Sequence, residues 1–434
     1  MTDRIDADWL REPHLHTLLR HLALGASRRA DGEVEPAWDA HTAYVVGGAV
    51  RNALLGVPVR DVDVATSRLP DDVAETAGTL GYKVVPTGIA HGTVTVVTPA
   101  GPYEVTTYRR DVETDGRHAT VAFTDELTAD AERRDFTINA LYADADGTIH
   151  DVVGGLPDIE SRTVRFIGDA DERIAEDFLR ILRFFRFHAH YGRGRPDANG
   201  LRSCARNKAG LAQLSPERVW SELRRLLEAP EPGMTMLWMR QTGVLSAVLP
   251  ESEKWGIDAL PGLVSAEHDL GWTPDPMLRL AAIVPPDAAR MEALADRLRM
   301  SNEERERLAA WARATPPVAQ LSEGKLRERL YREGHTGIED RLRLALASAR
   351  ARAATEDGAL EEAGGLVRLL GVAEAWQRPE FPLKGRDLVA LGVPPGPEVG
   401  ERLKALEEAW IASGFDGDRD AMIASALSGM SGGN

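Results

Sequence analysis

The hydrophobic periodicity of this chain changes near residue 165, and no other feature constrains the fold as strongly. Up to about Thr163, short apolar runs bounded by Gly, Pro, Asp and Asn alternate with helical patterns. Beyond about Asp169 the strand signals fade, and Ala, Leu, Arg and Glu recur at helical spacing. We therefore predict a mixed α+β region with a five-stranded sheet, followed by an all-α remainder. The five predicted strands are residues 43–46, 59–65, 82–85, 94–97 and 103–108.

Length and composition limit the class of protein. At 434 residues the chain is too long for one hydrophobic core, so several domains are expected. Its longest apolar runs are too short to span a bilayer, so we expect no contact with a membrane. A polar, acidic start and a single cysteine, Cys204, which can form no internal disulfide, predict a cytoplasmic protein.

The charge of the chain is unevenly distributed. The formal net charge of −16 argues against a nucleic-acid partner, yet eleven Lys or Arg and only three acidic residues fall between residues 180 and 225. A surface that follows phosphates needs such a local excess, although a solvated helical face would show it too. On charge alone, the two interpretations have equal weight.

The first candidate site joins a glycine turn to two aspartates. A predicted strand runs into Gly47 and Gly48, and a helix follows, so free backbone N–H groups stand at a turn that a triphosphate can approach. Asp61 and Asp63 are two apart in a strand-like run and should project from one face. Two convergent carboxylates beside a phosphate site suit two Mg²⁺ ions in nucleotidyl transfer. A lone Asp-x-Asp is a weak signal, and the glycine turn makes it strong.

Two further segments carry polar residues that suit a nucleotide. Glu104, in a predicted strand, is a third metal ligand, a general base for a 3′-hydroxyl, or a plain exposed residue. Arg133 and Arg134 can clamp triphosphate oxygens. Asp135 can accept from a ribose hydroxyl, and Asn139 can contribute an amide.

The segment 175–187 predicts one continuous helix. Glu176 and Arg180 are at i,i+4 and Asp177 and Arg180 at i,i+3, so all three should lie on one side. Phe178 should join an apolar stripe on the other side. The alternative for the charged residues is an exposed ion pair with little effect on stability.

Together these residues resemble the class II CCA-adding tRNA nucleotidyltransferases, a family with a polymerase-beta-type catalytic head. The matches are collinear, touch most of the chain and are specific as a set. They include Gly47-Gly-Ala-Val-Arg51, Asp61-Val-Asp63, Glu104-Val-Thr-Thr-Tyr-Arg109, Arg133-Arg-Asp-Phe-Thr-Ile-Asn139, Glu176-Asp-Phe-Leu-Arg180 and Ser215-Pro-Glu-Arg-Val-Trp-Ser-Glu222.

The resemblance implies four parts: a nucleotidyltransferase head over residues 1–165, a helical neck over 166–230, a helical body over 231–350 and a helical tail over 351–434. It implies two Mg²⁺ ions held by Asp61 and Asp63, with CTP and ATP as substrates. The nucleotide-binding residues that it implies are Gly47, Gly48, Arg51, Arg134, Asp135, Asn139, Glu176, Asp177 and Arg180.

The resemblance also turns Glu176, Asp177 and Arg180 into an amino-acid template for the base. A carboxylate accepts from the exocyclic amine of C or A, and a guanidinium donates to ring acceptors, with Glu176 holding Arg180. Uracil and guanine present the opposite polarity and would leave buried groups unpaired.

The partner implied by the resemblance is the 3′ end of tRNA, with its acceptor and T-arm side along the basic segment and contacted mainly through phosphates. The predicted RNA contacts are Arg183, Arg186, Arg202, Arg206 and Lys208. The sequence indicates no particular oligomeric state.

Other interpretations stay open at this point. Asn52 stands where the family usually has Asp, which puts any carboxylate role there in doubt. A poly(A) polymerase or a partial CC- or A-adding enzyme is the nearest rival, but residues 83–91 lack the basic stretch typical of bacterial poly(A) polymerases. Asp115 and Arg117 lie in a segment, 110–123, that corresponds to a flexible loop linked in the family to the switch from CTP to ATP, which favours full CCA addition.

Two rivals come from other classes. A non-catalytic RNA-binding scaffold would have lost a metal carboxylate, and Asp61 and Asp63 are both present. An enzyme that adenylates a small molecule would not need so long a helical region.

Overall fold

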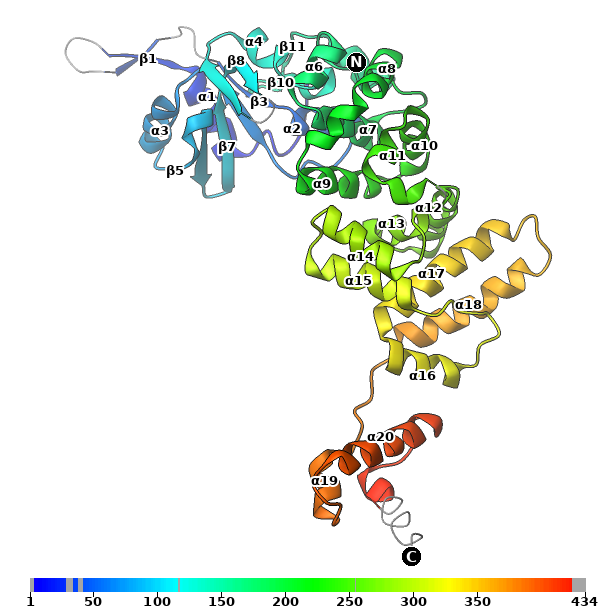
Figure 1. The fold of residues 1–434 in the computed structure, drawn as a ribbon. Helices are drawn as coiled ribbons and strands as arrows, with labels where there is room; N and C mark the ends of the chain where they lie inside the picture. The colour runs from blue at the N-terminus through cyan, green and yellow to red at the C-terminus, as the bar shows by residue number, and fades with distance from the viewer. Residues whose placement is uncertain (1–3, 29–33, 38–41, 116–117, 254, 424–434) are drawn as a thin grey trace, which may run out of the picture. The chain divides into compact units, whose positions relative to one another are not determined.

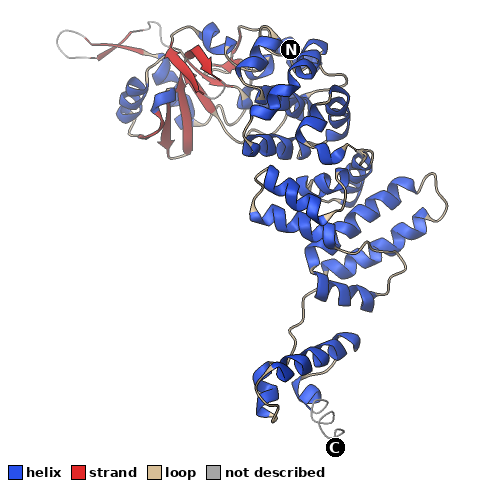
Figure 2. Cartoon of the chain, viewed as in Figure 1, coloured by secondary structure: helices blue, strands red, loops and turns tan. Residues whose placement is uncertain are grey.

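The computed structural model describes residues 4–28, 34–37, 42–115, 118–253 and 255–423. The chain divides into two compact units, Met1–Pro250 and Glu251–Asn434. In the described ranges all strands belong to the first unit, whereas the second is helical (Figure 2). The predicted α+β region followed by helices is therefore confirmed. The finer divisions at residues 165, 230 and 350 stay predictions.

The main sheet of the first unit has seven strands rather than the predicted five. All five predicted strands are present, and two strands of three residues each extend the edge next to β3. Three residues are too short to show an alternating pattern, which is why the sequence did not reveal them. In spatial order the strands are β11 (Ile149–Asp151), β10 (Leu141–Ala143), β3 (Ala43–Val46), β4 (Asp63–Thr66), β7 (Gly101–Thr107), β6 (Thr93–Thr98) and β5 (Lys83–Gly88).

Strand β4 is shorter than the predicted strand 59–65 and begins at Asp63. It pairs antiparallel with β3 and parallel with β7, and the first residue pair of the β3 ladder is Val46 with Asp63. Because β3 ends at Val46 and the chain turns at Gly47, Asp61 has no strand to pair with. Asp61 thus lies in the segment before the strand.

Helices cover the sheet because each buries one apolar stripe. Helix α1 (Pro13–Ala23) packs against β3 and β4 and buries Leu15, Leu18, Leu19 and Leu22, which follow the spacing of one helical face. Glu12 caps its first turn by accepting from two backbone N–H groups. Helix α3 (Pro70–Thr79) packs on β5, β6 and β7 (Figure 1).

Two antiparallel ribbons stand apart from the main sheet. They are β1 (Gly25–Arg28) with β2 (Val34–Ala37), and β8 (Arg109–Asp115) with β9 (His118–Phe123). The second ribbon covers the segment expected to be a loop; Asp115 is the last residue of β8, and Arg117 lies outside the described residues. Short helices α4 (Leu127–Glu132), η2 (Thr137–Asn139) and α5 (Gly155–Ser161) also belong to the α+β part.

The expected continuous helix over 175–187 is wrong. Helix α6 (Ala170–Glu176) ends before Asp177, whose backbone is extended, and helix α7 (Leu179–Tyr191) begins two residues later. Phe178 lies after the break, as the residue that precedes α7, and its ring lies where a side chain on Gly210 would have to be.

Helix α7 packs against α9 (Pro216–Leu227) and α10 (Pro232–Thr242) in the first unit (Figure 1). The remaining elements of this unit are α2 (Gly48–Leu55), η1 (Ile89–His91), α8 (Ala198–Asn207), η3 (Lys208–Gln213) and α11 (Val244–Val248).

The second unit has its own core and a fully buried ion pair, Arg279 with Glu267. None of the helices in the described ranges combines the length and the apolar character needed to cross a bilayer. The elements of the second unit are η4 (Pro250–Ser252, which begins at the unit boundary), α12 (Ala259–Leu270), α13 (Pro276–Ile283), α14 (Ala288–Arg297), α15 (Asn302–Arg313), α16 (Glu323–Glu333), α17 (His335–Arg352), α18 (Ala359–Glu374), α19 (Gly385–Ala390) and α20 (Pro397–Ala412).

Candidate active site

A cleft of about 430 Å³ in the first unit gathers residues from most of the predicted motifs. A larger hollow of about 780 Å³ lies beside residues 4–17, but its lining contains none of the motif residues. We therefore take the smaller cleft as the candidate site. It is lined by Gly47, Gly48, Arg51, Asp63, Arg133, Arg134, Asp135, Asn139, Asp177, Leu179, Arg180, Arg183, Phe187 and Arg218.

The glycine turn and the carboxylates meet at one end of strand β4. Asp63 is in register with Val46, directly before Gly47, and on its other side with Glu104 of β7. Partial withdrawal from solvent raises the pKa of Asp63, and the negative charges of Glu104 and Asp61 raise it further. The nearby guanidinium of Arg134 acts in the opposite direction. Negative charge is thus concentrated here without full compensation.

This concentration of charge fits a divalent cation. In the described part of the chain, no three His, Cys, Asp or Glu side chains are already placed to hold a metal ion. Mg²⁺, however, usually keeps several waters and takes only one or two carboxylates together with substrate phosphates. The repulsion that Asp63 receives from Asp61 and Glu104 is what such a cation would relieve.

A buried aspartate that was not predicted from the sequence orients Arg133 and Arg134, the two arginines predicted to clamp triphosphate oxygens. Asp130 accepts from Arg133 Nε at 2.9 Å, from Arg134 Nη2 at 3.0 Å and from the Tyr142 hydroxyl at 2.8 Å. Burial raises the pKa of Asp130, but the two arginines and Tyr142 outweigh it, so the pKa lies below its usual value. The helical spacing from Asp130 to the two arginines is a signal that could have revealed it.

Asp135 and Asn139 are part of a buried network rather than free ligands. Asp135 Oδ1 accepts from Asn139 Nδ2 at 3.1 Å, and its Oδ2 accepts from Arg183 Nε at 2.7 Å. Asn139 Oδ1 in turn accepts from Arg51 Nη1 at 2.5 Å, and Arg51 stacks 4.0 Å above the centre of the Tyr191 ring. Arg183, predicted to contact RNA, therefore faces the cleft.

Asn52, the departure from the family pattern, uses both ends of its amide. Its Oδ1 accepts from Arg51 Nη2 at 2.9 Å, and its Nδ2 donates to the Pro58 carbonyl oxygen at 3.0 Å. An ionised aspartate could accept from Arg51 but could not donate to Pro58. Asn52 thus ties helix α2 to the segment that leads to Asp61.

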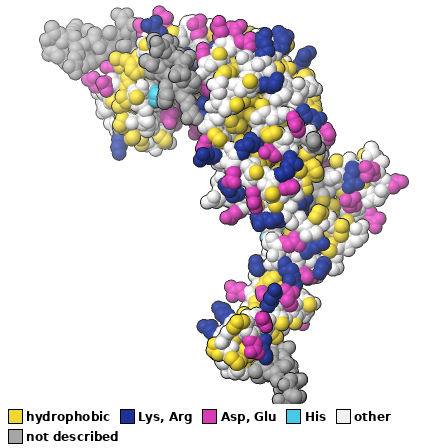
Figure 3. Space-filling view, in the orientation of Figure 1, with side chains coloured by type: hydrophobic (Ala, Val, Ile, Leu, Met, Phe, Trp, Pro, Cys, Tyr) yellow, Lys and Arg dark blue, Asp and Glu magenta, His cyan; other side chains and the backbone are white. Residues whose placement is uncertain are grey.

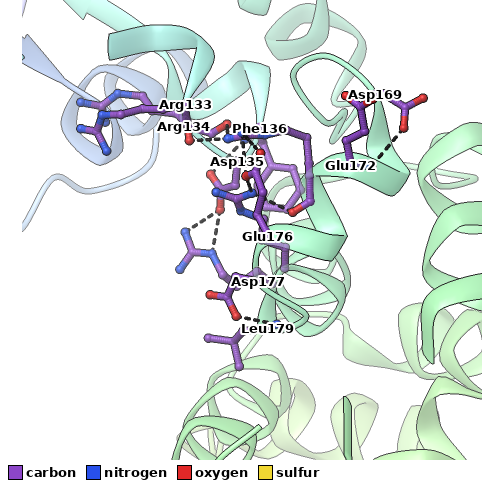
Figure 4. Close-up of polar contacts among 12 residues, drawn as sticks. Arg133, Arg134, Asp135, Phe136, Asp169, Glu172, Glu176, Asp177 and Leu179 are labelled. Atoms are coloured by element: carbon purple, nitrogen blue, oxygen red, sulfur yellow. Dashed lines mark hydrogen bonds and ion pairs between the residues drawn. The ribbon is translucent and has the colours of Figure 1, made fainter. Parts of the chain in front are cut away.

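The three proposed template residues are positioned by neighbours, as Figure 4 shows in part. Glu176 forms an ion pair with Arg180, and it also accepts from Arg173 Nη1 at 2.8 Å. Asp177 Oδ1 accepts from the Leu179 backbone N–H at 3.0 Å, and Oδ2 accepts from Arg218 Nη2 at 2.6 Å. The expected ion pair of Glu176 with Arg180 is present, although the three residues do not share one helix.

The five predicted RNA contacts fall into two groups. Arg183 and Arg186 point inward, and Arg186 Nε donates to Glu222 at 2.5 Å. Arg202, Arg206 and Lys208 are exposed on α8 and at the start of η3, with Arg206 paired to Asp171. On the face shown in Figure 3, basic and acidic side chains are interspersed.

Comparisons with known proteins show which families this chain resembles. The family described as the Poly A polymerase head domain matches residues 43–165, and the one described as a probable RNA and SrmB-binding site of polymerase A matches residues 197–255. The chain is 33% identical over 395 residues to the mitochondrial CCA tRNA nucleotidyltransferase 1 of Mus musculus, covering 88% of this chain and 86% of that protein.

Bacterial relatives and a solved structure extend the likeness. Over 395 residues the chain is 32% identical to the CCA-adding enzyme of Lactiplantibacillus plantarum, covering 88% of this chain and 91% of that one. The crystal structure of the Bacillus stearothermophilus CCA-adding enzyme in complex with CTP matches with a TM-score of 0.69 at 27% identity, covering 95% of this chain and 96% of that chain.

Proposed function

This chain belongs to the CCA-adding tRNA nucleotidyltransferases, and we propose that it adds or repairs the 3′-terminal CCA of tRNA by transferring CMP and AMP from CTP and ATP. One observation carries the assignment of the site. A single cleft is lined by the glycine turn, Asp63, the arginine clamp and the base-reading residues Asp177 and Arg180. These are the groups that nucleotidyl transfer with base selection requires.

The charge of the cleft suits a triphosphate. Six arginines and three aspartates line it, so its lining carries a positive excess that attracts the anionic nucleotide. Asp130 holds the guanidinium groups of Arg133 and Arg134 in place before the substrate arrives. Pre-placed donors lose little side-chain entropy when they bind the phosphates.

The carboxylates at the end of β4 would hold the metal ions. Asp61 and Asp63 are the proposed ligands of two Mg²⁺ ions, and Glu104 is adjacent as a third ligand or as the acceptor of the 3′-hydroxyl proton. When bound, Mg²⁺ supplies a lower pKa for the attacking 3′-hydroxyl and stabilises the charge that develops on the departing pyrophosphate.

Base selection is assigned to the break between α6 and α7. The Asp177 carboxylate would accept from the exocyclic amine of C or A, and Arg180, held by Glu176, would donate to the ring acceptors. UTP and GTP would leave these partly buried groups unpaired, which is costly.

The tRNA would approach along the exposed basic residues of the helical part. Arg202, Arg206 and Lys208 are the proposed phosphate contacts for the acceptor and T-arm side. The inward-facing Arg183 and Arg186 would support the nucleotide site through their ion pairs with Asp135 and Glu222.

Product analysis tests the proposal directly. Purified protein is given a tRNA that ends at the discriminator base, with Mg²⁺ and labelled CTP or ATP. We expect two C and one A to be added, after which extension stops. Absence of incorporation would refute the proposal. When Mg²⁺ is omitted, we expect no incorporation.

A poly(A) polymerase is the second candidate, because the family that matches residues 43–165 is described as a Poly A polymerase head domain. The same assay separates the two functions by product length. Long A tracts on an RNA without a tRNA fold would favour poly(A) synthesis, whereas a stop after one A favours CCA addition.

A further inference from the structure

The two base-reading residues are held by different partners. Arg180 is fixed by Glu176 and donates to the Arg173 carbonyl oxygen at 2.7 Å. The Asp177 carboxylate is held by different groups: it accepts hydrogen bonds from the Leu179 backbone N–H and from Arg218. Each partner can therefore be removed while the other reading group keeps its support.

We propose that Arg218 is a positioning residue that sets base selectivity by orienting the Asp177 carboxylate toward the exocyclic amine of the incoming base. The inference rests on the proposed function and adds a selectivity determinant outside the base-reading residues themselves.

The backbone at Asp177 explains why an external partner is needed. Asp177 lies between two helices with φ −155° and ψ 106°, so no helical geometry fixes the direction of its side chain. One hydrogen bond, from the Leu179 N–H to Oδ1, would leave the carboxylate free to turn about that contact. The Arg218 bond to Oδ2, at 2.6 Å, fixes the second oxygen and with it the plane of the group.

Arg218 is itself well anchored for this task. It lies in the first turn of α9, and Glu222, one turn later, is buried and bonded to Arg186 of α7. Helices α7 and α9 pack against each other. The Arg218 side chain is 33% exposed and lines the cleft, so its guanidinium reaches Asp177 from a fixed helix without being sealed in the core.

The bond to Arg218 leaves Asp177 able to read a base. An ionised carboxylate only accepts hydrogen bonds and offers about four lone-pair sites. In the structure two of these serve Leu179 and Arg218, so acceptor capacity remains for an amine. Loss of Arg218 should weaken recognition of the amine and leave the ring contacts of Arg180 in place.

Nucleotide analogues that lack the amine test this inference. Single additions are measured as kcat/KM with CTP and with the triphosphate of the pyrimidin-2-one riboside, which lacks the 4-amino group. ATP is paired with purine riboside triphosphate in the same way. For the unaltered protein, a charged hydrogen bond to the amine predicts that the analogue is about 10- to 100-fold poorer.

Arg218→Ala should reduce that analogue penalty by about tenfold. The kcat/KM for CTP should fall toward the value for the analogue, whereas the kcat/KM for the analogue should change little. Arg218→Lys should retain part of the penalty, since one donor replaces a planar fork. The matched control is Arg20→Ala, which removes a surface ion pair of similar length with Asp146 outside the cleft and should leave the penalty unchanged.

An unchanged penalty in Arg218→Ala, with both substrates slowed equally, would overturn the inference and leave Arg218 a merely structural residue. Tighter CTP binding in the variant would also overturn it, since Arg218 would then compete with the base. Failure of the unaltered protein to add C or A at all would instead refute the proposed function, and this inference with it.

Discussion

Replacing Asp130 by Asn tests whether a buried charge organises the arginine clamp. The side chain of Asp130 is 1% exposed, and those of Arg133 and Arg134, its partners, are 15% and 19% exposed. Asn keeps the shape and can still accept from Tyr142, but it removes the negative charge. Two guanidinium groups then remain in a partly dry site without the carboxylate that binds both of them.

The expected cost follows from this burial. Removing one partner of a buried ion pair typically destabilises a protein by about 3 to 5 kcal/mol. Because both arginines keep some access to water, we expect the lower end, about 3 kcal/mol in the free energy of unfolding of the first unit. Arginines without this anchor should also bind CTP more weakly.

Urea denaturation of both proteins, followed by circular dichroism, measures this difference, and CTP titration measures the affinity. The control is Asp146→Asn, which breaks the pair with Arg20 at a side chain that is 59% exposed and should cost under about 1 kcal/mol. Equal stability of Asp130→Asn and the unaltered protein would refute the view that Asp130 holds the clamp.

The difference in the free energy of unfolding between Asp130→Asn and the unaltered protein should change with pH in a definite direction. The folded state lowers the pKa of Asp130, so the ionised carboxylate stabilises the fold at pH values above its unfolded-state pKa of about 4. This stabilisation is lost as the pH falls through the pKa that Asp130 has in the folded state. The gap between the two proteins should therefore be largest at neutral pH and shrink in acid. A gap that grows in acid would contradict this assignment.

Three further perturbations test other parts of the site. Asp63→Asn should abolish incorporation. It should also raise the free energy of unfolding at neutral pH, because a carboxyl whose pKa is raised in the folded state destabilises the fold once it is ionised. Lower stability of the variant in urea would contradict this. Arg180→Ala should cut the preference for CTP over UTP by about tenfold in competition assays, and unchanged selectivity would remove its reading role. Neutralising Arg202, Arg206 and Lys208 together should weaken tRNA binding and reduce the slope of log affinity against log salt by about 2 to 3, whereas an unchanged slope would mark a solvated face.

Local patterns let the sequence predict much of the candidate site. The glycine turn and the Asp61 and Asp63 pair were recognised from neighbouring residues, whereas the position of Glu104 beside Asp63 depends on the pairing of β4 with β7. The predicted pairing of Glu176 with Arg180 is present, but it spans the break between α6 and α7 and does not lie within one helical turn.

Partners distant in the chain escaped prediction. Arg183 faces Asp135, which lies 48 residues earlier, and therefore points inward instead of toward solvent. Strands β10 and β11 exist because they pair at the sheet edge, not because three residues show a pattern. Their positions depend on contacts that the spacing of residues cannot encode.

The sequence by itself determined which chemical groups this protein has and that they belong to a nucleotide site, because each motif is read from neighbouring residues. Only the tertiary structure decided how Asp177 and Arg180, the proposed base-reading residues, are held. The helix ends before Asp177, and Arg218, 41 residues later, bonds to its carboxylate. Side-chain direction at such a break depends on what the fold brings beside it, and helical periodicity gives no information there.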